Sequence, residues 1–150
     1  MPDEAPQTMS NMSKPTPKPT ACPCDLGATY EDCCGRFHAG ALHLQAPDAS
    51  TLMRSRYSAY VLGLHSYLLQ TWHPSSRPES LDATPPGLRW LGLEVQATAL
   101  QSADAATVRF VARSKLVGRA HRLLETSRFV RVDGRWYYVS GDVNEELKEI

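Results

Sequence analysis

The cysteine residues offer the clearest chemistry in this sequence. All four lie between positions 22 and 34, as Cys22-Pro23-Cys24 and, eight residues later, Cys33-Cys34. Four thiolates in two pairs across a short loop can hold one Zn²⁺ ion in a tetrahedron, with Zn–S distances of about 2.3 Å. We therefore predict one structural zinc ion bound by all four cysteines. Four thiolates close the coordination sphere and leave no position for catalysis.

Two other interpretations of the cysteines are a pair of disulfides and a set of redox-active thiols. Bridges between adjacent cysteines strain the backbone, whereas crossed pairs such as Cys22–Cys33 with Cys24–Cys34 can form. Crossed disulfides suit a secreted chain, but the first twenty residues contain no apolar core of a secretory signal. Zinc is favoured on this ground. His38 and His43 are the candidate substitutes if one cysteine is not a ligand.

The spacing of the cysteines resembles the SEC-C motif, a small zinc-binding module found at the end of the SecA translocase and in other bacterial proteins. Tyr30 matches the aromatic residue of that motif, whereas Asp25-Leu26-Gly27 stands where the motif usually has Gly-Ser-Gly. In SecA the module contacts protein partners. The resemblance therefore implies a protein partner for the zinc-binding segment, with a nucleic-acid or ribosomal surface as the alternative.

A second set of residues could serve a ligand pocket or an active site. Its aromatic, basic and acidic members are Arg54, Arg56, Tyr57, Trp72, His73, Trp90, Glu94, Glu125, Arg128, Trp136 and Tyr138. A carboxylate from Glu94 or Glu125 beside His73 or Tyr138 would supply a general base and a general acid. The same residues also suit a structural role, in which the aromatic rings fill a core and the arginines pair with the glutamates. Without a Gly-rich phosphate loop or a Ser-His-Asp signature, we assign no catalytic residue.

The chain divides into four parts that must position these residues. Residues 1–20 are rich in proline and poor in large apolar side chains, so they are predicted to form a disordered tail. Residues 21–46 form the zinc-binding segment, which is too short for a core of its own and needs the metal to fold. Residues 47–143 form the larger domain, and residues 144–150 an acidic tail. The expected contacts of the zinc-binding segment with the domain are Phe37, Leu42 and Leu44.

Two helices are predicted at the start of the domain. Asp48 is the predicted N-cap of the first, which ends or kinks at Gly63. Its helical period places Leu52, Tyr57 or Arg56, Ala59, Tyr60 and Leu62 on the core face, and Arg54, Ser55 and Ser58 on other faces. A shorter helix ends at His73-Pro74, because the residue before a proline avoids the helical conformation. Residues 75–87 are predicted to be a loop.

The second half of the domain has the period-two pattern of strands. Leu91, Leu93, Val95, Ala97 and Ala99 form the apolar face of the first predicted strand. Residues 107–116, 121–132 and 135–140 are the next three strands, and the connecting turns are 104–105, 117–118 and Asp133-Gly134. Helices followed by a four-stranded antiparallel meander predict an α+β domain.

Charge and hydropathy exclude some function classes. Sixteen acidic and sixteen basic residues balance, so no net charge draws the chain to nucleic acid. Segment 109–135 is basic and segment 142–150 is acidic; we favour solvated surfaces over a basic patch for an anionic partner, because stacking aromatic residues are lacking. No apolar run approaches the ~18 residues of a membrane span. Reduced thiols without a signal sequence indicate the cytoplasm.

Several stretches, in this order, resemble the YchJ family of uncharacterised bacterial proteins. They are residues 52–61 (LMRSRYSAYV), 67–68 (YL), 71–75 (TWHPS), 90–93 (WLGL), 110–113 (FVAR), 125–129 (ETSRF) and 134–138 (GRWYY). With the cysteines, the match runs from Cys22 to about Asp142. The resemblance implies a SEC-C motif followed by an NTF2-like domain, a curved sheet wrapped on helices to form a cone with a pocket. Some members carry a second SEC-C motif at the C-terminus, which this chain lacks, and the family brings no established activity.

Two functions remain after this comparison. The favoured one is a non-enzymatic interaction protein, in which the zinc-binding segment docks a partner and the NTF2-like domain is a scaffold. The alternative is a pocket that binds or converts a small molecule, with purely structural zinc. Polar groups converging on a hollow favour the second function, and a cone filled by Trp and Tyr side chains favours the first. The oligomeric state is not predicted.

Overall fold

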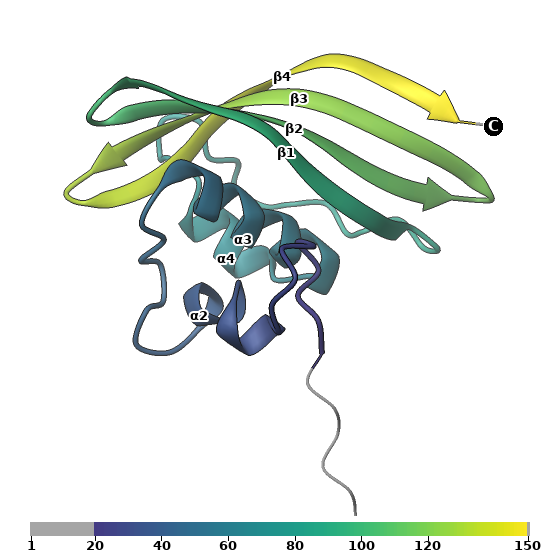
Figure 1. Cartoon of the computed structure of the whole chain (residues 1–150), viewed down its shortest axis with the longest axis horizontal. Coiled ribbons are helices and arrows are strands. Elements are labelled where there is room, and N and C mark those ends of the chain that lie inside the picture. The colour runs from purple at the N-terminus through teal and green to yellow at the C-terminus, as the bar shows by residue number, and fades with distance from the viewer. Residues whose placement is uncertain (1–19, 150) are drawn as a thin grey trace, which may run out of the picture.

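The computed structural model describes residues 20–149, with side chains up to Val143. It shows helices packed on one side of a curved sheet (Figure 1). The elements are η1 (Tyr30–Asp32), α2 (Gly35–His38), α3 (Ala49–Leu62), α4 (His65–Gln70), β1 (Arg89–Ser102), β2 (Ala105–Leu116), β3 (Arg119–Val132) and β4 (Arg135–Glu149). This order confirms the predicted α+β class. The tail predicted at the N-terminus lies, up to position 19, outside the described residues.

Helix α3 begins and ends where the sequence indicates. The Asp48 side chain accepts a hydrogen bond of 2.8 Å from the backbone N–H of Thr51, which satisfies one of the free donors of the first turn. Gly63 ends the helix with a left-handed backbone (φ 74°) that only glycine adopts without strain. Helix α4 follows directly and is folded back beneath the sheet (Figure 1).

The buried surface of α3 is wider than predicted. Ser55 and Ser58, expected on other faces, are fully buried, and Leu62, expected in the core, is exposed. The reason is that α3 lies between the sheet and the cysteine segment, so both of its faces are covered. Ser55 donates to the Leu52 carbonyl, and its hydroxyl also contacts the Tyr67 hydroxyl, both at 2.8 Å.

The sheet is an antiparallel meander in the order β1-β2-β3-β4. The turns at Val117-Gly118 and Asp133-Gly134 have left-handed backbones at both positions, the conformation that tight hairpins require. Strand β4 is longer than predicted and continues past Ser140 to Glu149. Most of the acidic segment predicted as a tail therefore pairs with β3.

Strand β1 departs from the predicted alternation at two irregularities. Register shifts between Trp90 and Gly92 and between Val95 and Ala97 each insert an extra residue, which reverses the faces of the residues beyond it. Leu91 is consequently exposed, whereas Trp90 packs toward α3 with its ring 5.6 Å from that of Tyr57. The prediction that Leu91, Ala97 and Ala99 lie on the core face was therefore wrong.

The cysteine segment shares one hydrophobic core with the domain. All four cysteines are buried in the same cluster as Leu52 of α3 and Leu68 of α4. Of the three expected contacts, Phe37 is buried and Leu44 packs against the core, but Leu42 is exposed because it lies in a surface turn. No helix among the described residues is long and apolar enough to cross a bilayer.

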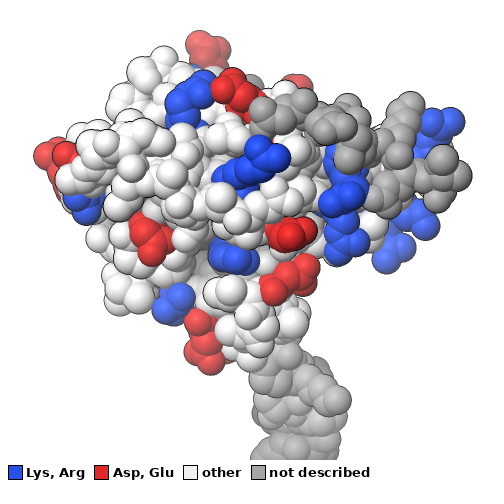
Figure 2. Space-filling model, turned by 45° about the horizontal axis from the view of Figure 1, so that its top comes forward, with Lys and Arg blue, Asp and Glu red and all other residues white. Residues whose placement is uncertain are grey.

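The basic residues of the strands do not form one continuous surface. On the face shown in Figure 2, Lys and Arg side chains are spread among uncharged and acidic ones. Arg128 pairs with Asp142 at 2.8 Å and Arg131 with Asp104 at 3.0 Å. These exposed pairs match the interpretation of solvated strand surfaces.

Candidate metal centre and cavity

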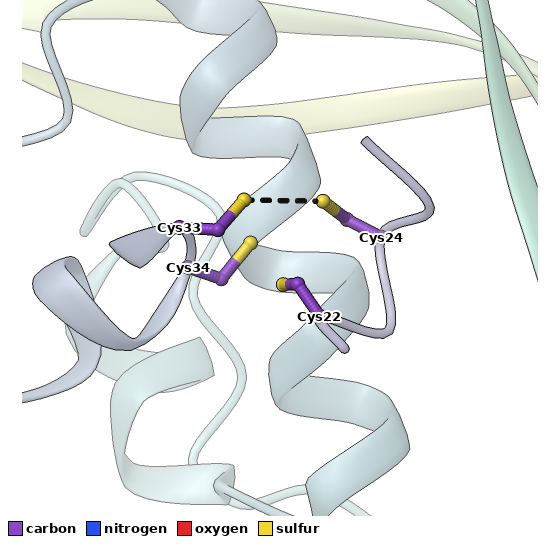
Figure 3. A group of neighbouring side chains, drawn as sticks. All are labelled: Cys22, Cys24, Cys33 and Cys34. Atoms are coloured by element: carbon purple, nitrogen blue, oxygen red, sulfur yellow. Dashed lines mark hydrogen bonds between the residues drawn. The ribbon is translucent and has the colours of Figure 1, made fainter. Parts of the chain in front are cut away.

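The four cysteines meet at one point beside α3 (Figure 3). Cys22 and Cys24 lie on a loop that is closed by a hydrogen bond of 3.0 Å from the Cys22 N–H to the Ala28 carbonyl. Cys33 and Cys34 lie between η1 and α2. The loop and the short helices thus bring two pairs of thiols together, and their sulfur atoms all lie within 4.8 Å of one another.

The thiols fit a zinc ion and do not fit disulfides. A tetrahedron of thiolates at about 2.3 Å from zinc separates neighbouring sulfur atoms by roughly 3.8 Å. Cys24 and Cys33 have their sulfur atoms 3.6 Å apart, far longer than a disulfide bond of about 2.05 Å. All four thiols are free and buried. The four thiols could therefore hold one metal ion, and the chemistry and spacing of the donors fit zinc.

Without a cation, the cluster carries one favoured thiolate. A hydrogen bond from Cys34 lowers the pKa of Cys24 to about 5. Burial raises the pKa of Cys33 to about 11, and the hydrogen bond to Cys24 raises the pKa of Cys34. A bound dication stabilises the thiolate form of its ligands and so displaces the remaining protons. Zinc affinity should accordingly fall as the pH is lowered.

His38 has another role beside the centre. Its Nε2 faces the Ser55 carbonyl at 2.8 Å and must donate a proton to it, so that Nδ1 accepts from the Tyr30 hydroxyl. Burial lowers the pKa of His38 and favours this neutral form. Both ring nitrogens are thus occupied, and neither is free to act as a substitute ligand.

Helix α3 also supports the cysteines from outside the sulfur cluster. Arg54 Nη1 donates to the Cys24 carbonyl at 3.1 Å, and the Ser58 hydroxyl lies 3.5 Å from the Cys22 sulfur. Hydrogen bonds of this kind orient the ligands of a metal. The position of α3 and the geometry of the centre therefore depend on each other.

A cavity of about 210 Å³ lies between α3 and the sheet. It is lined by Met53, Arg56, Tyr57, Tyr60, Trp90, Phe110, Ala112, Leu123, Glu125, Ser127 and Tyr138. Tyr60 and Trp90 also line a neighbouring hollow of about 350 Å³ under the loop at residues 81–88. The rings of Tyr60 and Trp90 thus border both spaces.

Arg56 is the positive group of the cavity. Its side chain is 3% exposed, and its Nη1 donates to the Leu68 carbonyl at 2.8 Å and to the Thr71 hydroxyl at 2.7 Å. The guanidinium lies over the Tyr138 ring, 4.4 Å from its centroid. Among the described residues, no carboxylate lies within ion-pair distance of it. Burial lowers the pKa of Arg56, but a guanidinium keeps its charge in proteins.

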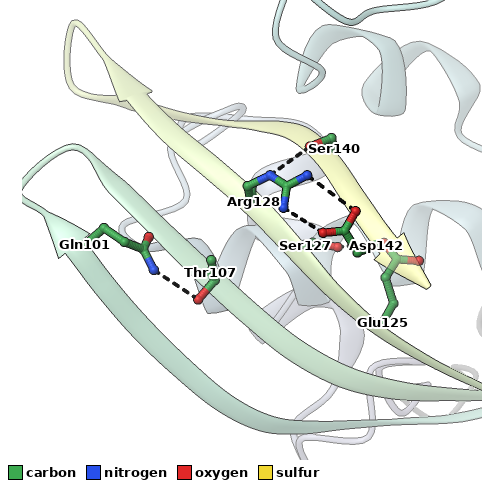
Figure 4. A network of polar contacts seen from close by, with 7 residues as sticks. All are labelled: Gln101, Thr107, Glu125, Ser127, Arg128, Ser140 and Asp142. Carbon is green, nitrogen blue, oxygen red and sulfur yellow. Dashed lines mark hydrogen bonds and ion pairs between the residues drawn. The ribbon is translucent and has the colours of Figure 1, made fainter. Parts of the chain in front are cut away.

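Glu125 is the acidic group of the cavity. Its carboxylate accepts a hydrogen bond of 2.7 Å from the Ser127 hydroxyl, and both residues lie on β3 beside β4 (Figure 4). It occupies the space beside Gly141, where a Cβ atom would overlap it. Burial and the nearby Glu125 charge raise the pKa of Tyr138 to about 12, so this phenol remains protonated.

Tyr57 joins the cavity to the cysteine segment. Its ring lines the cavity, and the backbone of Gly92 is close enough to its hydroxyl to act on its pKa, in the lowering direction. Asp25 of the cysteine loop and Arg113 of β2 approach that glycine so closely that a Cβ there would lie 2.7 and 2.8 Å from their side chains. Burial, followed by the Asp25 charge, raises the pKa of Tyr57 to about 12.

Comparisons with known proteins identify the family. The family model described as "YchJ, middle NTF2-like domain" matches residues 48–141. A UPF0225 protein of Bordetella parapertussis is 58% identical over 132 residues, which cover 88% of this chain and 99% of that protein. This chain belongs to the YchJ family. The resemblance drawn from the sequence is thereby confirmed.

Solved structures similar to this YchJ-family chain carry the same cysteine motif in their descriptions. The solution structure of a SEC-C motif containing protein from Rhodopseudomonas palustris has a TM-score of 0.72 and 33% identity, covering 83% of this chain and 98% of that one. The crystal structure of a SEC-C motif containing protein from Psychrobacter arcticus has a TM-score of 0.66 and 29% identity, covering 83% and 82%. The predicted SEC-C and NTF2-like architecture is confirmed.

The fold brings together only part of the predicted pocket. Tyr57, Trp90, Glu125 and Tyr138 line the cavity of this YchJ-family protein, as does Arg56. Trp72 lies one layer behind, with its ring against that of Tyr138 at 5.0 Å, and Trp136 is buried beneath Arg131.

The remaining predicted pocket residues face elsewhere. Arg54 contacts the cysteine loop. His73 is bonded to the Ser75 hydroxyl at the surface, and Glu94 is exposed because it pairs with Val111 on the opposite face of the sheet. Arg128 pairs with Asp142. Glu94 and His73 therefore do not meet Glu125 or Tyr138 as base and acid.

Sequence reasoning did not assign several lining residues to the pocket. They are Met53, Tyr60, Phe110, Ala112, Leu123 and Ser127. The period of two in the sequence could have indicated the strand residues. Phe110 and Ala112 are two apart and share one face of β2, and Leu123, Glu125 and Ser127 share one face of β3 in the same way. Because Ala112 pairs with Leu123, these two sets of residues lie on the same face of the sheet.

Proposed function

We propose that this protein binds a small organic molecule in the cavity between α3 and the sheet, while a structural zinc ion on the four cysteines holds α3 in place. The observation that supports this proposal is the convergence of Arg56, Glu125 and Tyr138 on an open hollow. A part of the core without function would be filled to native density by apolar side chains. Polar groups that converge on an otherwise apolar cavity are typical of ligand sites.

The zinc ion is supported by the four clustered sulfur atoms and by the similar SEC-C motif proteins. Native mass spectrometry under reducing conditions tests it. We expect a mass gain of one zinc ion per chain, which a chelator removes and Cys24→Ser abolishes. A metal-free chain whose mass is short of four hydrogens would indicate two disulfides and overturn the zinc site. Thiolate zinc sites persist where thiols stay reduced, and we therefore place the protein in the cytoplasm.

The ligand site is tested by filling the cavity. Ala112→Phe introduces a ring into the hollow, and Ala97→Phe introduces the same ring on exposed β1 as a matched control. We expect some compounds of a small-molecule library to raise the melting temperature of the wild type and of Ala97→Phe but not of Ala112→Phe. If every compound that stabilises the wild type stabilises Ala112→Phe equally, or if none stabilises the wild type, the cavity is not a ligand site.

Docking of a protein on the cysteine segment is a second candidate function. It is favoured by two large apolar side chains on the surface of that segment, Leu26 and Leu42, which are 58% and 47% exposed. Contiguous exposed apolar surface is typical of an interaction site, and docking requires that Leu26 and Leu42 belong to one such surface. A partner enriched by the wild type and lost with Leu26→Ser/Leu42→Ser would support docking, and equal enrichment by both would contradict it.

A further inference from the structure

Arg56 is a buried cation that forms no ion pair among the described residues. The rings of Trp72 and Tyr138 lie against its guanidinium, and Glu125 acts on it only as a more distant charge. A buried cation is costly unless an anion or several acceptors surround it. Here two acceptors, the Leu68 carbonyl and the Thr71 hydroxyl, both bind Nη1. The Nε and Nη2 donors have no hydrogen-bond acceptor among the described residues, and the side chain lines the cavity. A guanidinium in this state is prepared to bind a planar anion, and carboxylates match its geometry.

The size and walls of the cavity limit the rest of the molecule. A cavity of about 150 Å³ with apolar walls holds benzene, so about 210 Å³ accommodates a six-membered ring with one or two small substituents. Five aromatic side chains line this space: Tyr57, Tyr60, Trp90, Phe110 and Tyr138. Aromatic walls favour a flat ring in stacked or edge-on contact.

Glu125 sets the second polar requirement. An ionised carboxylate can accept about four hydrogen bonds, and Glu125 accepts one from Ser127 among the described residues. It also repels a second carboxylate, so the acid group of a ligand belongs beside Arg56 and away from Glu125. A hydroxyl or amino group at the other end of the ring would donate to Glu125.

We propose that the cavity binds a small aromatic carboxylate, with the acid group on Arg56 and a hydroxyl or amino substituent directed to Glu125. This inference rests on the proposed ligand-binding function and names the chemical class of its ligand. The competing role for Arg56 is purely structural, as a cap on the last carbonyls of α4. That role requires no anion in the cavity, and the experiment separates the two.

The test compares three probes by isothermal titration of the full-length zinc-loaded chain. They are 4-hydroxybenzoate, its neutral counterpart 4-hydroxybenzamide, and benzoate. Charge-assisted bidentate hydrogen bonds contribute about 1.5–3 kcal/mol, so we expect 4-hydroxybenzoate to bind at least about tenfold more tightly than the amide. We expect benzoate to bind more weakly than 4-hydroxybenzoate, because it offers no donor to Glu125.

Two variants assign the effects to residues. Arg56→Met should remove the preference for the acid over the amide, and Glu125→Leu should remove the preference for 4-hydroxybenzoate over benzoate. If Arg56→Met fails to fold, the ratio of the affinities of the wild type for the acid and the amide, together with the Glu125→Leu measurements, still tests the proposed ligand class. Equal binding of acid and amide, sensitive to Ala112→Phe, would overturn the carboxylate and leave the ligand site intact. Binding of none of the probes would overturn the ligand class, and only the library result bears on the site itself.

Discussion

Gly141 is a residue whose identity follows from two close neighbours, chiefly Glu125. Its Cβ would overlap the Glu125 carboxylate and lie 3.1 Å from the Tyr138 hydroxyl. We expect Gly141→Ala to displace Glu125 and to lower the free energy of unfolding by about 1–3 kcal/mol, the usual cost of overpacking. Urea denaturation measures this change.

A double-mutant cycle shows whether Glu125 is the cause. In a Glu125→Ala background the overlap with the carboxylate is gone and only the Tyr138 hydroxyl remains close, at 3.1 Å. An alanine in a strand is otherwise favoured over glycine by roughly 0.5–1 kcal/mol. Gly141→Ala should therefore become neutral or stabilising there. An equal loss of stability in both backgrounds would show that the carboxylate is not the obstacle.

Single residues differ in how well the sequence predicts their place. The four cysteines could be predicted to form one cluster, because their close spacing has few chemical explanations. The structure brings their sulfur atoms together. Arg56 was less predictable, since a helical period indicates a face but cannot show that a cation on that face forms no ion pair. The isolation of Arg56 depends on residues of β3 and β4 that are distant in sequence.

The β2–β3 hairpin contains an unfavourable residue in its turn. Val117 is 87% exposed and has φ 52°, a backbone conformation that a β-branched side chain adopts with strain. Asparagine before glycine is the preferred pair for such a turn. We expect Val117→Asn to raise the free energy of unfolding by about 0.5–1 kcal/mol, as measured by chemical denaturation.

The other hairpin supplies a matched control for Val117→Asn. Val132 is also exposed but lies in a strand, so Val132→Asn loses strand propensity and should be neutral or mildly destabilising. Stabilisation by both substitutions would indicate a general surface effect rather than relief of turn strain.

Elements were predictable where local chemistry decides them. Asp48, Gly63 and Asp133-Gly134 mark a helix start, a helix end and a turn through hydrogen bonds and backbone angles within a few residues. The irregularities of β1 were not predictable. In the sequence the apolar alternation continues without a break through Leu91 and Ala97, whereas in the structure β1 has an extra residue near each of them. The faces of β1 are set by pairing with β2.

The whole molecule should respond to metal removal as one unit. The cysteines share a core with α3 and α4, and thiolate zinc sites contribute about 10 kcal/mol or more to folding. We expect a chelator to lower the melting temperature by at least about 10 °C. Hydrogen exchange should rise both in the cysteine segment and along α3, and loss of protection confined to residues 22–38 would contradict the shared core.

The sequence predicts the architecture of the molecule better than its internal contacts. Helices before strands, together with the family resemblance, indicated the class and the fold. The sharing of one core between the cysteine segment and the domain, and the open cavity, arise from contacts between distant residues. These contacts have no signature in spacing or composition.

The meeting of Asp25, Gly92 and Arg113 beside Tyr57 has a thermodynamic consequence. Tyr57 touches the cavity on one side and the cysteine loop on the other, so the proposed zinc ion and the proposed ligand would stabilise the same arrangement. Linkage then requires that each raises the affinity of the other by the same factor. A chain deprived of zinc should release its ligand more readily, and the amount of ligand held would follow the supply of the metal.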